Sequence, residues 1–351
     1  MDFKPYLEMM INKKASDIFV SAGSQVRIKI EGRQHKIGET VYTPQMCREA
    51  VHSLMTPEQI AEYEKKRELD LGIGIEGRGR FRVNAFYQRG SAAMVIRYLA
   101  NAIPSIEDLG VPAALKDLVM HKRGIVLMVG ATGSGKSTTL AAMVDHRNKN
   151  SNGHILTIED PVEYLHPHQG CIVNQRDVGS DTLSYAAALK SSLREAPDVI
   201  LIGEVRTRET MEAAIELSGT GHLCLSTLHA NNCHQALERV INLFPQDLHK
   251  TLFMDLSLNL RAIISQRLVR TVEGKRTAAV EIMINTPHIA DLIRDGRVEE
   301  VKEAMAGSDE GGMITFDNAL LALYKSGRVS LEECLVNADS SANLEAKINF
   351  G

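Results

Sequence analysis

A glycine-rich octapeptide in the middle of the chain limits the possible fold more than any other feature. It matches the pattern G-x-x-x-x-G-K-[ST] at every required position. Apolar residues 125–129 precede it, and a stretch compatible with a helix follows from Thr138. This context predicts a strand, a tight loop and a helix. The loop residues are Gly130, Ala131, Thr132, Gly133, Ser134, Gly135, Lys136 and Ser137.

Such a loop is suited to binding phosphate. Its glycines let the backbone curl so that successive N–H groups and the helix N-terminus point at one phosphate. Lys136 is then expected to reach the β- and γ-phosphates, and the Ser137 hydroxyl to ligate the Mg²⁺ that bridges them. A chance glycine-rich turn would explain neither the matched positions nor the flanking strand. We therefore predict that residues 130–138 bind ATP with Mg²⁺.

Further short apolar runs at residues 154–158, 199–202 and 223–228 alternate with helical stretches, which predicts a parallel sheet in an α/β layer. Glu204 follows the second run, at the carboxyl edge where such sheets place ligands. It is expected to hold Mg²⁺ through water, or else to be a solvated residue at a strand end. The cluster Glu159-Asp160-Pro161-Val162-Glu163 closes the first run and suits a water-activating site.

Two histidines, His222 and His229, flank the run at residues 223–228, so spacing places them at opposite ends of one strand. Spacing alone favours a structural role for each. The five cysteines form no CxxC pair, which argues against zinc and predicts buried, reduced thiols.

The first hundred residues have a different pattern. Residues 26–32 and 81–86 alternate apolar and polar side chains, which predicts an antiparallel sheet in a small α+β domain. Pro and Gly near residues 103–112 indicate a boundary. We therefore expect an N-terminal domain at 1–100, a linker at 101–113 and an ATPase domain at 114–351 that is mostly helical after about residue 245.

Charge is divided unequally between these parts. Residues 1–100 carry 16 Lys and Arg against 12 Asp and Glu, a net +4, whereas the remainder carries 24 against 32, a net −8. Arg78, Arg80 and Arg82 should share one face of a strand because side chains alternate. That face is either solvated, or it meets a phosphate or the acidic domain of a neighbouring subunit.

The overall charge of −4 argues against a dedicated duplex-DNA partner. Asp2, Lys4 and Glu8 precede any apolar run, which disfavours a signal peptide. The charge-free stretch 217–237 is long enough to cross a membrane but contains three histidines and several other polar residues, so we do not expect it to insert. A cytoplasmic protein is expected.

Together these motifs resemble the secretion ATPase superfamily, and within it the PilT/PilU group that powers type IV pilus retraction. The resemblance covers almost the whole chain, because the segments that carry it stand in the family's order and spacing. They are residues 15–18, 79–83, the loop at 130–137, 158–163, 203–204, 220–222 and 227–229.

The resemblance implies a PAS-like N-terminal domain followed by a RecA-like P-loop ATPase domain, assembled as a homo-hexamer. It implies Glu163 as catalytic base, Glu204 as the Walker B acid, and His222 and His229 as the His box. Arg82 and Arg97 become candidates to contact a neighbouring subunit's nucleotide. ATP turnover would then drive a membrane platform protein that removes pilin subunits.

Two departures narrow the resemblance. The chain lacks the tetracysteine zinc insert of the assembly-type ATPases, which favours a retraction motor for twitching motility. Ala290 replaces the first Arg of a C-terminal motif typical of PilT, and residues 166–170, 224–226 and 230–232 look more like PilU. This implies a companion PilT-like motor and a location at the inner membrane at the pilus base. Alternatives are an ATP-binding coupling ring with little turnover, and a RecA-like motor on nucleic acid, which the charge disfavours.

Overall fold

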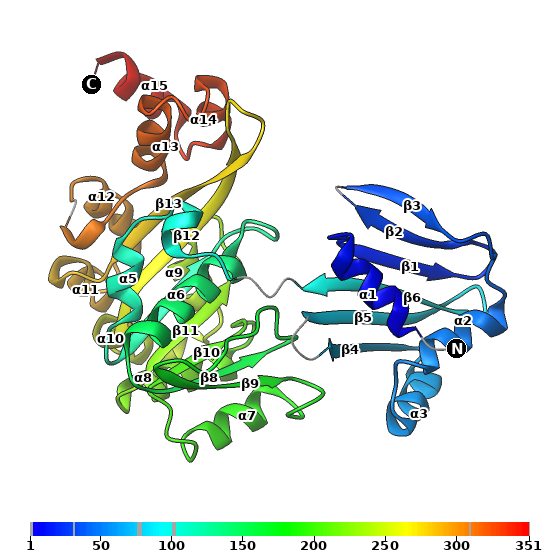
Figure 1. Ribbon diagram of the computed structural model, residues 1–351. Coiled ribbons are helices and arrows are strands. Elements are labelled where there is room, and N and C mark those ends of the chain that lie inside the picture. The colour runs from blue at the N-terminus through cyan, green and yellow to red at the C-terminus, as the bar shows by residue number, and fades with distance from the viewer. Residues whose placement is uncertain (1–2, 31, 76–78, 100–102, 309, 351) are drawn as a thin grey trace. The chain divides into compact units, whose positions relative to one another are not determined.

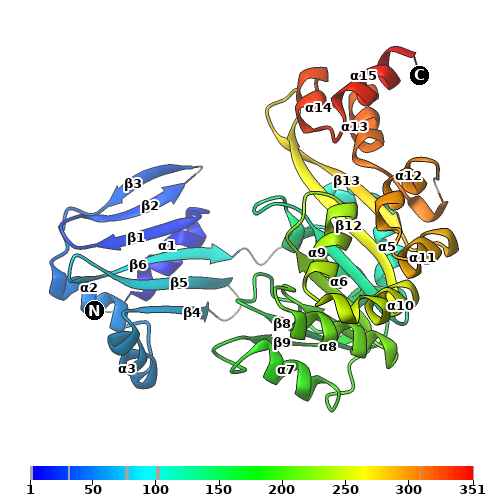
Figure 2. The same ribbon diagram turned by 180° about the vertical axis from the view of Figure 1, so that it is seen from behind.

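The computed structural model describes residues 3–30, 32–75, 79–99, 103–308 and 310–350. The chain divides into two compact units. The first comprises Met1–Ala102 together with Pro161–Leu165, and the second comprises Ile103–Asp160 with His166–Gly351. Each unit has its own sheet and helices (Figures 1 and 2).

The first unit is an antiparallel six-stranded sheet in the order β3-β2-β1-β6-β5-β4, with helices packed on it. Along β5, Phe81, Val83 and Ala85 are buried, as the alternation predicted. They pack with residues such as Leu7 and Val51 of the helices in one apolar core. The strands are β1 (Asp17–Ser21), β2 (Val26–Ile30), β3 (Arg33–Ile37), β4 (Glu68–Ile75), β5 (Gly79–Gln88) and β6 (Ser91–Leu99), and the helices are α1 (Lys4–Asn12), α2 (Pro44–His52) and α3 (Pro57–Lys66).

The second unit has a seven-stranded sheet in the order β13-β12-β7-β11-β10-β8-β9. Neighbouring strands are parallel except β13, which runs antiparallel at one edge. The parallel sheet that the sequence predicted is thus confirmed. Its strands are β7 (Gly124–Val129), β8 (Gly153–Glu159), β9 (Cys171–Asp177), β10 (Val199–Ile202), β11 (Leu223–Leu228), β12 (Leu260–Arg270) and β13 (Arg276–Ile284).

This sheet is buried on both faces. Ile125 and Leu127 of β7 belong to one apolar core, whereas the alternate residues Val126 and Met128 belong to the other. Helices α7 to α11 contribute to the first core, together with Val301 and Met305 later in the chain, and α4 to α6 contribute to the second. Their bounds are α4 (Ile106–Leu109), α5 (Ala114–Val119), α6 (Lys136–Asn150), α7 (Tyr185–Ser192), α8 (Arg208–Gly219), α9 (Cys233–Asn242), α10 (His249–Asn259) and α11 (Pro287–Arg294).

The region after residue 245 is mostly helical, as expected, but it also contains the two long strands β12 and β13, which the sequence pattern did not indicate. Burial explains the difference: Ala262, Ile263 and Ile264 are all buried, so this stretch lacks the one-sided pattern by which a strand is recognised. The helical part follows β13. Besides α11 it contains α12 (Val301–Ala306), α13 (Phe316–Lys325), α14 (Leu331–Asn337) and α15 (Ser341–Phe350), with short 3₁₀ turns at Val298–Glu300 and Glu310–Gly312; a further 3₁₀ turn, Gln246–Leu248, precedes α10.

All five cysteines are buried and free, as predicted. In the ranges that the structure describes, every helix is too short or too polar to span a lipid bilayer.

Candidate functional site

The glycine-rich loop connects β7 to α6, as the sequence predicted. Gly130, Gly133 and Gly135 adopt φ values of 147°, 78° and 89°, which residues other than glycine rarely adopt. A Cβ on Gly130 would lie 2.6 Å from the carbonyl oxygen of Gln266, so there is also no space for a side chain at this position. Gly135 caps α6, a helix of 15 residues, and Ala131, Thr132 and Gly133 are exposed. The loop therefore presents its backbone outward at the positive end of a helix dipole.

Two side chains of this loop fit a phosphate. Lys136 is almost buried, and its Nζ donates to the carbonyl oxygens of Gly130 and Ala131 at 2.9 Å each. Ser134 Oγ is buried and makes no hydrogen bond to any residue that the structure describes. A phosphate oxygen could accept from both groups, and Ser137, at the second position of α6, offers a half-buried hydroxyl to a cation. These residues suit a nucleotide with Mg²⁺.

Glu204 lies just after β10, and His229 just after the adjacent strand β11. Their side chains meet: His229 Nε2 is 3.1 Å from Glu204 Oε1. Arg206 Nε donates to the other carboxylate oxygen, Oε2, at 2.6 Å, and this contact raises the pKa of Arg206. Glu204 is only 16% exposed, so the two contacts fix a largely enclosed carboxylate at the carboxyl edge of the sheet.

The two histidines of the expected His box lie apart. His222 immediately precedes β11, whose first residue pairs with Gly124 at the start of β7. Its Nδ1 lies 3.0 Å from the Leu217 carbonyl oxygen and 3.2 Å from Thr220 Oγ1. The glycine-rich loop begins at the opposite end of β7. The structure therefore does not bring His222 to this site, and His229 is the histidine found there.

The acidic cluster is divided between the two units. Glu159, at the end of β8, accepts a hydrogen bond from Thr157 Oγ1 at 2.6 Å. Asp160 and Glu204 line a cavity of about 690 Å³ between α7 and α8, together with Tyr185, whose pKa is raised by burial and by the neighbouring carboxylates. Glu163 belongs to the segment Pro161–Leu165, which groups with the first unit.

Arg82 and Arg97 are direct cross-strand partners on β5 and β6. Arg97 Nε donates to the buried Asp17 carboxylate at 2.9 Å, while Arg82 lies 3.7 Å from Asp70. Like charges placed opposite each other are unfavourable without a counter-ion, and Arg97 remains 65% exposed. The two expected guanidinium groups thus share one face of the first sheet. Arg78 lies outside the described residues.

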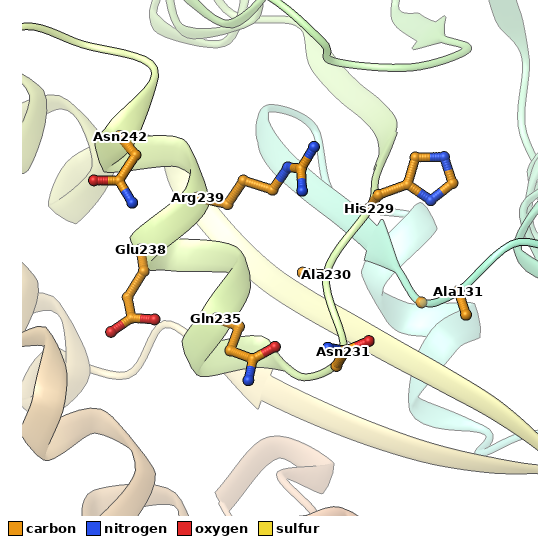
Figure 3. Close-up of a pocket in the computed structure, with 9 residues that line it drawn as sticks. Ala131, His229, Ala230, Asn231, Gln235, Glu238, Arg239 and Asn242 are labelled. Atoms are coloured by element: carbon orange, nitrogen blue, oxygen red, sulfur yellow. The ribbon is translucent and has the colours of Figure 1, made fainter.

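Sequence reasoning missed a polar pocket beside the loop. Ala131, His229 and side chains of α9 line a cavity of about 440 Å³, and Figure 3 shows these residues. The polar residues of α9 that line the cavity recur at helical spacing, and α9 follows soon after His229 in the sequence, so this pattern could have indicated the pocket. They are Gln235, Glu238, Arg239 and Asn242, and Ala230 and Asn231 complete the pocket.

A second missed group joins the loop after His229 to the C-terminal helices. Arg267 on β12 donates to the Asn231 carbonyl oxygen at 2.9 Å and to Asp339 at 2.5 Å. Glu281 on β13 accepts from the backbone N–H of Cys233 at 2.7 Å, at the start of α9. Burial raises the pKa of Glu281 to about 7. These contacts fix the position of the segment that carries His229.

Fold and site together define a P-loop protein of the α/β class. The family model described as "Type II/IV secretion system protein" matches residues 2–343, and the chain belongs to this family. Its two-domain α/β fold agrees with the expected PAS-like and RecA-like domains.

Among relatives, the chain is 52% identical to the Type IV pilus ATPase PilU of Pseudomonas aeruginosa, over 100% of this chain and 92% of the relative. It is 38% identical to the Type IV pilus retractation ATPase PilT of the same organism, over 98% and 100%. A crystal structure of the pilus retraction motor PilT with bound ADP superposes with a TM-score of 0.91 at 37% identity, covering 98% of this chain and 99% of that one. The expected membership of the PilT/PilU group, closer to PilU, is confirmed.

Proposed function

We propose that this protein is a Mg-ATP-hydrolysing motor subunit of the type IV pilus machinery, which drives or assists pilus retraction. The observation that carries this proposal is the shared edge of one sheet. The phosphate loop follows β7, and the Glu204–His229 pair follows the adjacent strands β10 and β11. The similarity to PilU and PilT supports the pilus as the place of action.

In this proposal the backbone N–H groups of the loop bind the ATP phosphates, and Lys136 exchanges the carbonyl oxygens of Gly130 and Ala131 for phosphate oxygens. Ser137, and Glu204 through water, would hold Mg²⁺, which supplies positive charge at the β- and γ-phosphates. Glu163 is proposed to orient the attacking water and take its proton. His229 keeps the Glu204 carboxylate in one orientation.

We further propose a homo-hexamer in which Arg82 and Arg97 of one subunit contact the nucleotide held by its neighbour. The two guanidinium groups support this, because they are cross-strand neighbours on β5 and β6 and remain 40% and 65% exposed beside their carboxylate partners, so both are accessible to a phosphate. By analogy with its relatives, the ring would act in the cytoplasm at the pilus base, beside a PilT-like companion and the inner-membrane platform protein.

Mixed rings test the proposed contact between subunits. The Arg82→Gln/Arg97→Gln double variant retains the phosphate loop, and Lys136→Ala retains both arginines. Each variant alone should lack turnover, whereas co-expressed rings should recover about a quarter of wild-type ATPase activity, because random assembly pairs intact halves at that frequency. The rate of ATP hydrolysis by the purified rings measures their activity, and light scattering measures their mass, which shows that they are assembled. Mixed rings no more active than the mean of the two pure rings would contradict a shared site.

The alternative is a coupling ring that binds ATP and stiffens a companion ring with little turnover of its own. A strain lacking this chain separates the two functions. We expect wild-type protein to restore twitching and Lys136→Ala to fail at equal abundance, because a motor subunit needs hydrolysis. Full restoration by Lys136→Ala would favour the coupling ring.

A further inference from the structure

Gln266 lies on β12, the strand next to β7, with its side chain against the phosphate loop. It is 3% exposed, and both polar atoms of its carboxamide are used. Nε2 donates to the Ser134 carbonyl oxygen at 2.8 Å, and Oε1 accepts from Thr139 Oγ1 at 2.8 Å. One side chain therefore joins the loop to the first turns of α6.

Gln266 also contacts the loop at two of its glycines. A Cβ on Gly130 would lie 2.6 Å from the Gln266 carbonyl oxygen, and a Cβ on Gly135 would lie 2.7 Å from Nε2. These glycines therefore give β12 room to approach the loop, in addition to allowing its curvature. The carboxamide supports the loop from inside the protein, while Ala131, Thr132 and Gly133 remain exposed on the other side.

We propose that Gln266 is a positioning residue for nucleotide binding, which holds the phosphate loop in its receptive conformation before the nucleotide arrives. The inference rests on the proposed ATP function and deepens it. A loop held by buried hydrogen bonds loses less conformational freedom when it binds phosphate, so removing the support should weaken affinity. Gln266 itself touches no phosphate in this proposal.

Gln266→Met keeps the length of the side chain and removes both hydrogen bonds. We expect the dissociation constant for ADP, measured by calorimetry, to rise about tenfold, the size expected for one or two lost buried hydrogen bonds. Amide hydrogen exchange at residues 133–136 without nucleotide should accelerate. Thr139→Val removes only one of the two bonds and should weaken ADP binding about threefold.

Thr277→Val is the matched control, because Thr277 on β13 is also a buried threonine, but its hydroxyl accepts a hydrogen bond from Arg328 and makes none with Gln266. It should lower thermal stability about as much as Thr139→Val without changing ADP affinity. This comparison separates positioning of the loop from general stability. Equal loss of affinity in the control would overturn the proposal.

Gln266→Glu supplies a further readout. A protonated carboxyl can donate to the Ser134 carbonyl oxygen, whereas a carboxylate cannot and would repel it. The ADP affinity of this variant, relative to wild type at each pH, should therefore fall as the pH rises from about 6 to about 9, the range into which burial moves such a carboxyl. Folded Gln266→Met and Thr139→Val proteins that bind ADP as tightly as wild type would overturn the inference alone. Wild-type protein that binds no ADP would overturn the proposed function as well.

Discussion

Replacing Lys136 with Ala should lower ATP turnover by about 100- to 1,000-fold, the range measured when one preorganised donor to a developing charge is removed. Its ammonium group is held by two carbonyl oxygens of the loop, at 2.9 Å each, so it is already placed where phosphate would bind. Alanine removes that charge and leaves the glycine-determined curvature of the loop unchanged. Phosphate release from the purified protein at saturating MgATP measures the effect.

Lys149→Ala provides the control for this change. Lys149 lies on the same helix but is 53% exposed and pairs with Asp145, so its loss should leave turnover within about twofold of wild type. Circular dichroism should confirm that both variants fold. A folded Lys136→Ala protein with the turnover of Lys149→Ala would remove the basis for the proposed hydrolysis.

The loop itself could be predicted because its motif dictates local geometry. A strand must deliver the chain to Gly130, positive φ values require glycine at Gly133 and Gly135, and a helix must begin at Lys136. All of these features are set by residues that lie close together in the sequence. The approach of Gln266 could not be predicted in this way, since it depends on which strand becomes the neighbour of β7, more than a hundred residues later.

The histidines show where physical reasoning from sequence could have gone further. A strand of six residues separates His222 from His229, and parallel sheets bind ligands only at their carboxyl edge. That rule alone selects His229, which the structure places 3.1 Å from Glu204. The pairing of Arg82 with Arg97 is different, because strand register depends on how two distant segments align, and neither segment's alternation fixes it.

Replacing Glu204 with Gln should lower turnover by about 10- to 100-fold, the range typical of residues that orient a metal's water ligands, while ATP binding is retained. The amide keeps the size of the side chain and an oxygen that can accept from Arg206, but it removes the charge that would orient the water shell of Mg²⁺. The Glu204 carboxylate is 16% exposed and contacted on both oxygens, so solvent cannot readily replace it. Binding is unaffected in this account because the loop and Lys136 hold the phosphates.

Two measurements separate these effects: the dissociation constant for a fluorescent ATP analogue, and the rate of a single turnover. The matched control is Glu212→Gln, since Glu212 is 43% exposed and pairs with Arg208 on the surface of α8. We expect the wild-type protein, Glu204→Gln and Glu212→Gln to bind the analogue with similar affinity, and only Glu204→Gln to lose hydrolysis.

His229→Gln should show a smaller loss of hydrolysis than Glu204→Gln, because Arg206 still holds the other carboxylate oxygen. A Glu204→Gln protein that hydrolyses ATP at the wild-type rate would place the metal-orienting carboxylate elsewhere, with Glu159 and Asp160 the next residues to replace.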